Sequence, residues 1–342
     1  MLEQTAVFQS DKLVNPTWLV RDGDVLVAAI ESSSPDGGLA TLRLDTTTGK
    51  LTDVISRVGS SGVGSACIAL RKDVVLVANY MTSPSLVASY RLRDGQLSEQ
   101  AISTITEFEG GSNVIESRQE AAHGHYVGVH PRQDDLVIVA DLGADLVKTF
   151  KLDKDGVLGS AQDFKAAPGT GPRQAAFHPT ADVIYVLYEL SSEMAVYDVE
   201  LSSGRLSHVQ TISMVAPDTK QSRDQLLAAA VRISQDGRFL YGSVRGDDLH
   251  PDGDCVVVYS ISADGRKLTP IQHARAPGGG WHIRDIELSP DDRYVATGTM
   301  AHGGDVYMFE RDSKTGLLSY KTQLRLKDDN GAVISPAKFL FL

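Results

Sequence analysis

The stretch HYVGVHPRQDDLVIVADLG, which runs from His125 to Gly143, reads as an apolar strand, a polar turn and a second strand rich in Val and Ile. The same pattern recurs along the whole chain at intervals of roughly fifty residues. Its other copies are NPTWLVRDGDVLVAAIES from Asn15, SACIALRKDVVLVANY from Ser65, RQAAFHPTADVIYVLYEL from Arg173, AAVRISQDGRFLYGSVRG from Ala229 and IRDIELSPDDRYVATGTM from Ile283. Each copy continues into a third strand and usually a fourth. Four short antiparallel strands per repeat are typical of a β-propeller blade, so the sequence predicts an all-β propeller.

Both ends of the chain resemble parts of one further blade. The C-terminal SPAKFLFL looks like a first strand, and EQTAVFQ near the N-terminus looks like a fourth strand. Pairing them in one blade would close a ring and remove two open sheet edges. We therefore expect a single domain over residues 1–342, a seven-bladed propeller with an incomplete seventh blade closed by both termini. The alternative is a six-bladed ring whose termini cover an edge.

Composition limits the possible partners. The net charge is −11 over 342 residues, and the acidic residues are scattered, which argues against binding to nucleic acid or an anionic membrane surface. No apolar run reaches the roughly 18 residues of a membrane span, and the first residues do not resemble a signal peptide. Cys67 and Cys255 fall in different blades and are expected to be buried thiols rather than a disulfide. We expect a cytoplasmic protein that acts on a small molecule, and its oligomeric state stays open.

Polar side chains recur at equivalent positions of the repeats. His125, Arg173 and Arg284 each stand six residues before the Pro of the first turn, so they share one position on the first strand of their blades. The second strands end in another polar set: Glu31, Tyr80, Asp141, Glu189 and Arg245. First strands line the channel of a propeller, and arginines there can hold a carboxylate or phosphate through paired hydrogen bonds. Any one of these residues alone is more often structural, but their shared offset favours a site for a small anion.

Motifs for other chemistries are missing from the sequence. There is no G-x-S-x-G elbow, no P-loop and no Cys/His metal signature. His123 and His125 form an H-x-H pair that a strand would place on one face, but no third ligand has suitable spacing. We therefore expect neither a metal nor a cofactor.

At these same residues the chain resembles the propeller-type lactonases, the family of bacterial 6-phosphogluconolactonase and fungal 3-carboxy-cis,cis-muconate lactonising enzyme. The matching stretches are NPTWLV, HGHYVGVHP, VADLGADLVKTFKLD, GTGPRQAAFHP, YVLYELSSEMAVYDV, DGRFLYGSVRG and SPAKFLFL, which together span most of the chain from Asn15 to Leu342. The resemblance implies an active site of His125, Arg173, Glu189 and Arg245, the positions that match the His, two Arg and Glu proposed for the lactonising enzyme. Arg284 matches a further arginine of the lactonases.

The resemblance has departures in the later repeats. Ala230 replaces an acidic residue of the family, Val244 replaces an Asn, and Gly298 and Thr299 replace an Asn-Gln pair. The function that the resemblance implies first is a metal-independent hydrolase of an anionic or sugar-acid lactone similar to 6-phosphogluconolactone. Glu189, His125 and Arg245 would then be catalytic, and Arg173 and Arg284 would bind substrate. The alternatives are a muconate-type cycloisomerase, which consumes no water, and a non-catalytic propeller that binds a peptide or protein.

Overall fold

The structure is a computed structural model, and it describes residues 2–34, 37–81, 86–106, 110–220, 225–246, 254–275, 282–300 and 304–342. In these ranges the chain is built from β-strands, with a single α-helix, α1 (Glu116–Gln119), of four residues. No helix of this part of the chain has the length and apolar character needed to cross a membrane. The prediction of an all-β chain with almost no helix is confirmed.

The chain divides into two compact units, and each is described by itself. The N-terminal unit consists of Phe8–Arg173 with Leu201–Arg205 and Leu342. The C-terminal unit consists of Gln174–Glu200 and Leu206–Phe341 with Met1–Val7. The single domain over residues 1–342 stays a prediction, and so does the closure of a ring.

The N-terminal unit contains three consecutive antiparallel sheets. The first is formed by β1 (Pro16–Asp22), β2 (Val25–Ile30), β3 (Gly38–Asp45) and β4 (Lys50–Val58). The second is formed by β5 (Ser65–Arg71), β6 (Val74–Asn79), β7 (Val87–Arg93) and β8 (Gln96–Leu97), with β9 (Ser103–Ile105) also paired to β7. The third is formed by β10 (Gly124–His130), β11 (Gln133–Asp141), β12 (Leu146–Leu152) and β13 (Leu158–Lys165). Except for β9, each strand pairs with the next strand of its sheet along the chain, as the repeat pattern predicts.

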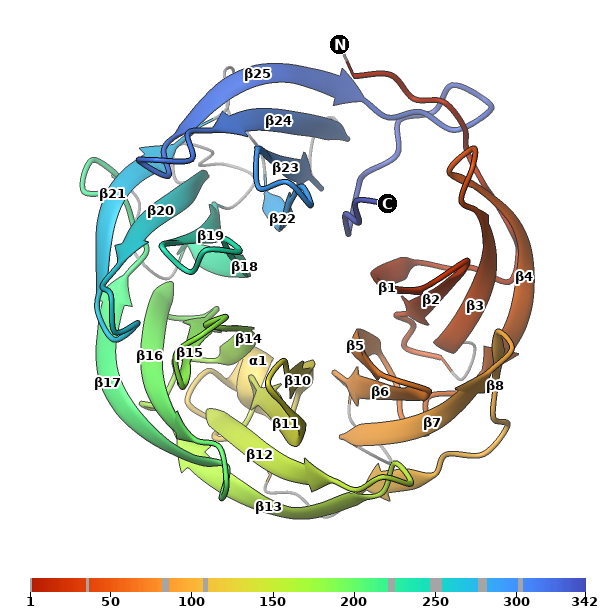
Figure 1. The fold of residues 1–342 in the computed structure, drawn as a ribbon, viewed down its shortest axis with the longest axis horizontal. Coiled ribbons are helices and arrows are strands. Elements are labelled where there is room, and N and C mark those ends of the chain that lie inside the picture. Colours follow the sequence, from red (N-terminus) through yellow and green to blue (C-terminus); the bar gives the residue numbers. More distant parts are fainter. Residues whose placement is uncertain are drawn as a thin grey trace. The chain divides into compact units, whose positions relative to one another are not determined.

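Three more sheets follow, and the first of them begins at the boundary between the units. They are β14 (Pro172–Phe177), β15 (Val183–Tyr188), β16 (Glu193–Glu200) and β17 (Arg205–Ser213); β18 (Leu227–Ile233), β19 (Phe239–Arg245), β20 (Cys255–Ile261) and β21 (Leu268–Ala274); and β22 (Ile283–Leu288), β23 (Tyr294–Thr299), β24 (Asp305–Arg311) and β25 (Leu318–Arg325). Within the C-terminal unit, Figure 1 shows the first strands β18 and β22 along one margin and the fourth strands β21 and β25 along the other.

In most of the sheets that the structure describes, the second strand is the most buried. The strands β2, β6 and β15 are buried at every position, whereas β25, with the sequence LSYKTQLR, is exposed at alternate or successive positions after its first residue. A continuous apolar run indicates a strand covered on both faces, and alternation indicates one face in water. In the C-terminal unit, side chains of neighbouring sheets share one core, including Tyr241, Val258, Ile286 and Phe309. Both cysteines are buried and free, as predicted.

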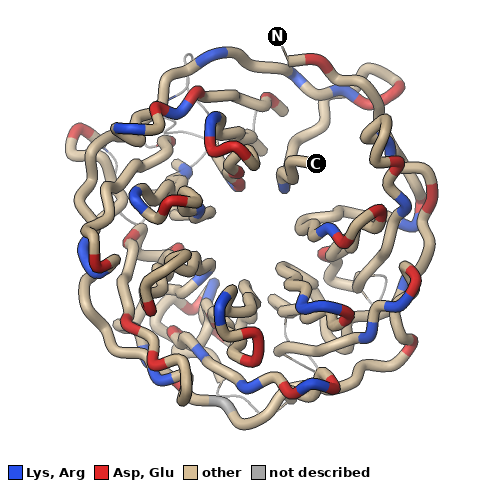
Figure 2. Tube along the Cα trace, in the orientation of Figure 1, with Lys and Arg blue, Asp and Glu red and all other residues tan. Residues whose placement is uncertain are grey.

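Charged residues are spread over both units rather than gathered. Figure 2 shows Lys and Arg interspersed with Asp and Glu along the strands and hairpin turns. Many of them form ion pairs within their own sheet, such as Arg43 with Asp24 at 2.7 Å and Arg91 with Asp73 at 2.9 Å. The scatter expected from the sequence is therefore seen in the structure.

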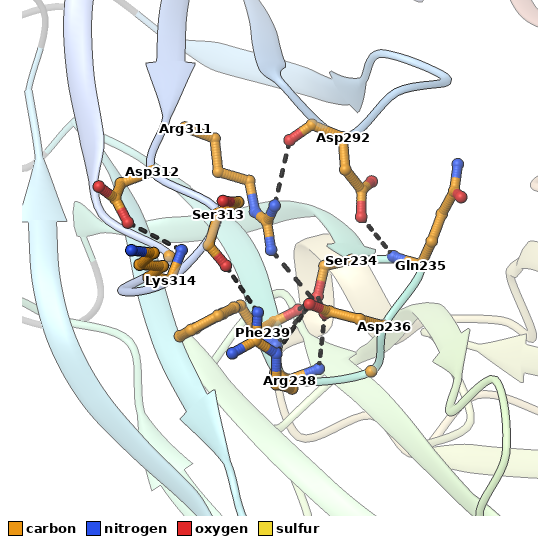
Figure 3. Close-up of polar contacts among 12 residues, drawn as sticks. Ser234, Gln235, Asp236, Arg238, Phe239, Asp292, Arg311, Asp312, Ser313 and Lys314 are labelled. Atoms are coloured by element: carbon orange, nitrogen blue, oxygen red, sulfur yellow. Dashed lines mark hydrogen bonds and ion pairs between the residues drawn. The ribbon is translucent and has the colours of Figure 1, made fainter.

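A recurring five-residue turn of the pattern S-x-D-x-R closes hairpins of the C-terminal unit. In Ser234–Arg238, the Ser234 hydroxyl donates to Asp236 at 2.6 Å and the Arg238 backbone N–H donates to the same carboxylate at 3.1 Å. The fourth residue is left-handed, with φ of 69° at Gly237. Figure 3 shows this turn beside Arg311 of the next sheet, which donates to the carbonyl of Asp292 at 3.2 Å. The same pattern recurs at residues 262–266 and 289–293.

Buried hydroxyl groups join neighbouring sheets within each unit. Each donates to the carbonyl of a glycine in a hairpin of the following sheet: Thr41 to Gly95 at 2.6 Å, Ser89 to Gly156 at 2.7 Å, Tyr185 to Gly265 at 2.7 Å and Tyr241 to Gly316 at 2.9 Å. At Gly316, with φ of 75°, a Cβ would lie 2.2 Å from the Phe239 ring. The turn therefore needs glycine both for its backbone conformation and for the close approach of the next sheet.

The terminal segments do not form the two strands expected from their sequences. The described part of the chain forms six sheets, as in the alternative, and residues 326–342 contribute only an isolated bridge between Lys327 and Val333. The two ends nevertheless meet, because the Gln4 amide donates to the Lys327 carbonyl at 2.6 Å and accepts from the Lys327 N–H at 3.0 Å. Side chains, rather than a ladder, hold the C-terminal segment. Lys338 donates to Asp285 and Glu287, both at 2.9 Å.

Candidate functional site

A buried ion pair joins two of the predicted site residues in the C-terminal unit. Glu189 follows β15 directly, and Arg245 is the last residue of β19, so both lie at the ends of second strands. Arg245 Nη2 donates to Glu189 Oε1 at 2.7 Å, and the two residues are only 7% and 1% exposed. The backbone of Glu189 is fixed as well, because its carbonyl accepts from the Ala228 N–H at 3.1 Å. Two charges removed from water need such a contact to offset their desolvation.

Two residues that the sequence did not indicate complete this cluster. Asp254 accepts the backbone N–H of Gly246 at 2.5 Å and that of His282 at 2.6 Å. The His282 ring lies 3.4 Å from Arg245, measured from Nε2 to Nη1. His282 has a left-handed backbone with φ of 62°. A histidine in that region stores strain, which is frequent at functional sites.

Asp254 is a buried carboxyl with a raised pKa. It is 3% exposed, and burial raises its pKa to about 7, although the N–H groups of Gly246 and His282 and the charge of Arg245 act in the opposite direction. A group that exchanges a proton near neutral pH suits acid–base chemistry. The cluster therefore combines a carboxylate, a cation and a carboxyl that titrates near neutrality.

Arg284 lies two residues after His282, on the first strand β22. Its Nη1 is 3.7 Å from Met300 Sδ. The structure thus places Arg284 in the same unit as Glu189 and Arg245. That all three converge on one substrate stays a prediction.

The other two predicted residues belong to the N-terminal unit. His125 is the second residue of β10 and is 8% exposed. Its ring meets the Tyr80 ring edge-on at 5.6 Å, and His123 stacks on the same ring at 4.4 Å. His123 is engaged at both nitrogens, with Nδ1 2.6 Å from the Tyr80 carbonyl and Nε2 3.1 Å from Glu120. In the part of the chain that the structure describes, no three His, Cys, Asp or Glu residues are arranged to hold a metal.

Arg173 is 2% exposed and follows a loop of small residues, Gly169–Thr170–Gly171–Pro172. It is the last residue of the main segment of the N-terminal unit. The structure therefore gives two groups, one with His125 and Arg173 and one with Glu189, Arg245 and Arg284. Their convergence at one mouth of a channel stays a prediction.

His282, which was not among the predicted site residues, stands at a recurring position in the sequence. His282 stands eight residues before Pro290, the same offset as His123 before Pro131. His282 and His123 each stand two residues before the aligned positions Arg284 and His125, which is the next position on the same face of a strand. Aligning this position as well would indicate His282. Asp254 lies in the connection between β19 and β20, directly before β20, as Asp145 lies directly before β12.

The repeated antiparallel sheets, each built from consecutive strands, define a β-propeller protein. The chain matches the family described as "Lactonase, 7-bladed beta-propeller" over residues 2–333, and it belongs to this family. It is 30% identical over 311 residues to 6-phosphogluconolactonase of Bacillus subtilis, covering 90% of this chain and 83% of that protein.

Solved structures show the same fold. The periplasmic gluconolactonase PpgL of Pseudomonas aeruginosa is 27% identical, with a TM-score of 0.78 over 91% of this chain and 85% of that one. A putative 6-phosphogluconolactonase of Bacteroides fragilis has a TM-score of 0.79 at 22% identity, covering 92% of this chain and 86% of that one. The resemblance inferred from the sequence is confirmed at the level of the family.

Proposed function

We propose that this protein hydrolyses a lactone of a sugar acid or a similar anionic lactone. The observation that carries the proposal is the buried Glu189–Arg245 pair, which stands at two positions implied by the family resemblance. Relatives named for 6-phosphogluconolactone and gluconolactone hydrolysis support the substrate class. We propose a reaction without a metal, since the groups needed to activate water and to stabilise an oxyanion are side chains.

Arg245 and Glu189 divide the chemistry between them. Before substrate binds, the guanidinium of Arg245 neutralises the Glu189 carboxylate at 2.7 Å. The carbonyl oxygen of a lactone gains negative charge as water attacks, so it competes for the same guanidinium in the transition state. Glu189 is then able to take a proton from the attacking water. Removing one donor to such an oxyanion typically lowers kcat by about 10²–10³-fold.

The remaining steps complete the hydrolysis. The water oxygen forms a bond to the carbonyl carbon, the bond between that carbon and the ring oxygen breaks, and the ring oxygen takes a proton to become a hydroxyl group. At the positions that the family resemblance indicates, we propose His125 as the acid or orienting group, and Arg173 and Arg284 as the residues that bind the anionic group. A substrate held by Arg173 alike in ground and transition states predicts that Arg173→Ala raises KM and leaves kcat nearly unchanged.

The proposal is tested by incubating the purified protein with 6-phosphogluconolactone, gluconolactone and a muconolactone, and by measuring rates above spontaneous hydrolysis with the mass of each product. A product heavier by one water is expected. An unchanged mass with turnover would instead show the cycloisomerase. No turnover of any lactone, together with a protein partner bound in solution, would favour the non-catalytic propeller.

A further inference from the structure

The last residue of β11 and the four-residue connection to β12 form the segment Asp141–Leu142–Gly143–Ala144–Asp145, which we name the DLGAD turn. It lies wholly within the N-terminal unit. Both of its carboxylates are buried, with exposed fractions of 0% at Asp141 and 4% at Asp145. A short turn with two buried carboxylates is expensive unless each has hydrogen-bond donors.

The Asp145 carboxylate binds the loop that leads into Arg173. Oδ2 accepts from the Gly169 N–H at 2.7 Å, and Oδ1 accepts from the Gly171 N–H at 2.8 Å. The backbone carbonyl of Asp145 also accepts from the Ala166 N–H at 2.8 Å. The loop is therefore held at three points by one residue. Hydrogen bonds to a carboxylate are stronger than those between neutral groups.

Only one residue separates Gly171 from Arg173, and it is Pro172. The proline ring fixes its own φ and restricts the residue before it. Little backbone freedom is left between the point held by Asp145 and the Cα of Arg173. The place from which the Arg173 side chain extends is thus determined by Asp145.

Asp141 acts in the same way on the segment that carries His125. Its Oδ1 accepts from the His123 N–H at 2.8 Å and from the Ala144 N–H at 3.1 Å. The Leu142 N–H donates to the His123 carbonyl at 2.9 Å. Both the backbone N–H and the backbone carbonyl of His123, two residues before His125, are therefore hydrogen-bonded to the DLGAD turn.

The loop and helix before His123 also close on this turn. Ser112 donates its N–H to the Gly143 carbonyl at 2.8 Å and its hydroxyl to Asp145 at 2.8 Å. Gln119, in α1, donates to the Leu142 carbonyl at 3.0 Å. A Cβ on Gly143 would lie 1.8 Å from the Ala121 carbonyl oxygen, so the backbones meet there without room for a side chain.

We propose that the DLGAD turn is the positioning element of the N-terminal unit's part of the site, with Asp145 positioning Arg173 and Asp141 positioning His125. One turn then sets the place of an anion-binding arginine and of a histidine. This inference rests on the proposed function, because it assigns both residues to substrate. A displacement of about 1 Å in a positioned group is enough to cost up to roughly 10²-fold in rate.

The test is a double-mutant cycle on kcat/KM with a sugar-acid lactone. Asp145→Asn keeps a residue that tolerates the left-handed backbone, with φ of 54°, but turns an amide NH₂ toward a backbone N–H. We expect kcat/KM to fall by about 10- to 100-fold in this variant, and by no further factor when it is added to Arg173→Ala. The matched control is Asp94→Asn, an exposed aspartate of the same unit with φ of 50°, which should leave kcat/KM unchanged. Equal losses with and without Arg173 would overturn the proposal.

Hydrogen–deuterium exchange supplies a measurement that needs no activity. Asp145→Asn should speed exchange at residues 166–173 and 110–119, and leave β5 to β7 as protected as before. Opened loops with an unchanged kcat/KM would show that Asp145 is only structural. If the wild-type protein turns over no lactone, the proposed function fails, and exchange then decides the positional claim. Faster exchange over the whole unit, rather than at the two loops, would contradict it.

Discussion

Asp254 is a residue of the candidate site whose charge depends on the surrounding protein. Burial raises its pKa from 3.8 to about 7, although two backbone N–H groups and Arg245 favour the ionised form. The folded protein therefore binds this proton more tightly than the unfolded chain does. Its stabilising contribution is complete at low pH and is lost as pH rises through about 7.

This loss of stability with rising pH gives a prediction for Asp254→Asn. Between pH 4 and 7, the free energy of unfolding of the wild type should fall relative to that of the variant, with a slope of at most about 1.4 kcal/mol per pH unit. Urea unfolding at several pH values measures the slope. Asp264→Asn is the control, because the hydrogen bond from Ser262 and that from the Arg266 N–H keep the pKa of this exposed carboxyl below 3.8. Parallel curves for wild type and Asp254→Asn would show that Asp254 does not titrate in this range.

Site residues differ in how far the sequence could indicate them. The alignment of the repeats indicates Glu189 and Arg245, and in the structure these two side chains lie 2.7 Å apart. Asp145 and Asp254 act through backbone N–H groups far along the chain, such as that of His282, 28 residues after Asp254. Any residue offers such an N–H, so no pattern of residue types points to the contact. It exists only once the turns are folded.

At the scale of elements, the C-terminal segment explains one departure from the family pattern. A Cβ at Gly298, on β23, would lie 2.4 Å from Pro336 and 2.6 Å from Phe339. Gly298 thus provides the space in which residues 335–339 pack against the last sheet. At the neighbouring departure, Thr299 accepts from the Asp305 N–H at 3.1 Å and so closes the connection between β23 and β24. Val244 and Ala230 are fully buried.

Lys338 is the main polar anchor of that segment. Its ammonium group contacts Asp285 and Glu287, which also pair with Arg232, so two cations balance two carboxylates. Burial raises the pKa of Glu287, but the charges of Arg232 and Lys338 outweigh burial and leave the pKa lowered. Removing one partner from a buried network leaves a carboxylate without sufficient compensation.

Lys338→Met keeps the apolar stem of the side chain and removes its charge. We expect it to lower the free energy of unfolding by about 3–5 kcal/mol, measured by urea denaturation at neutral pH. Lys327→Met is the matched control, since Lys327 is exposed in the same segment and bonds Gln4 only through its backbone. Equal stabilities of the two variants would mean that the Lys338 network does not hold the segment.

Strand order was predictable because each sheet is local in sequence. Every sheet is formed by consecutive strands, and the apolar runs and Gly or Asp turns mark them directly. The terminal strands were not predictable in the same way. SPAKFLFL has the apolar character of a first strand, but it is held by the Lys338 network and by packing on Gly298 rather than by a ladder. Composition does not distinguish these two ways of holding a short apolar segment.

For the whole molecule, family and fold agree while the substrate is inferred. The match to the lactonase family extends over residues 2–333, so both units contribute to the family pattern. The structure places the predicted residues in two groups, one in each unit. The central claim is that the Glu189–Arg245 group performs hydrolysis, and it is tested by removing the proposed base alone.

The most direct measurement is the steady-state kinetics of Glu189→Gln on the lactone that the wild type hydrolyses fastest. Gln keeps the shape of the side chain and an oxygen that accepts from Arg245, so the variant should fold, which circular dichroism can verify. Glu200→Gln, an exposed residue at the end of β16, is the control. The account predicts that Glu189→Gln lowers kcat by roughly 10²–10⁴-fold with little change in KM. Turnover by Glu189→Gln at the wild-type rate would remove Glu189 from the chemistry and contradict the account.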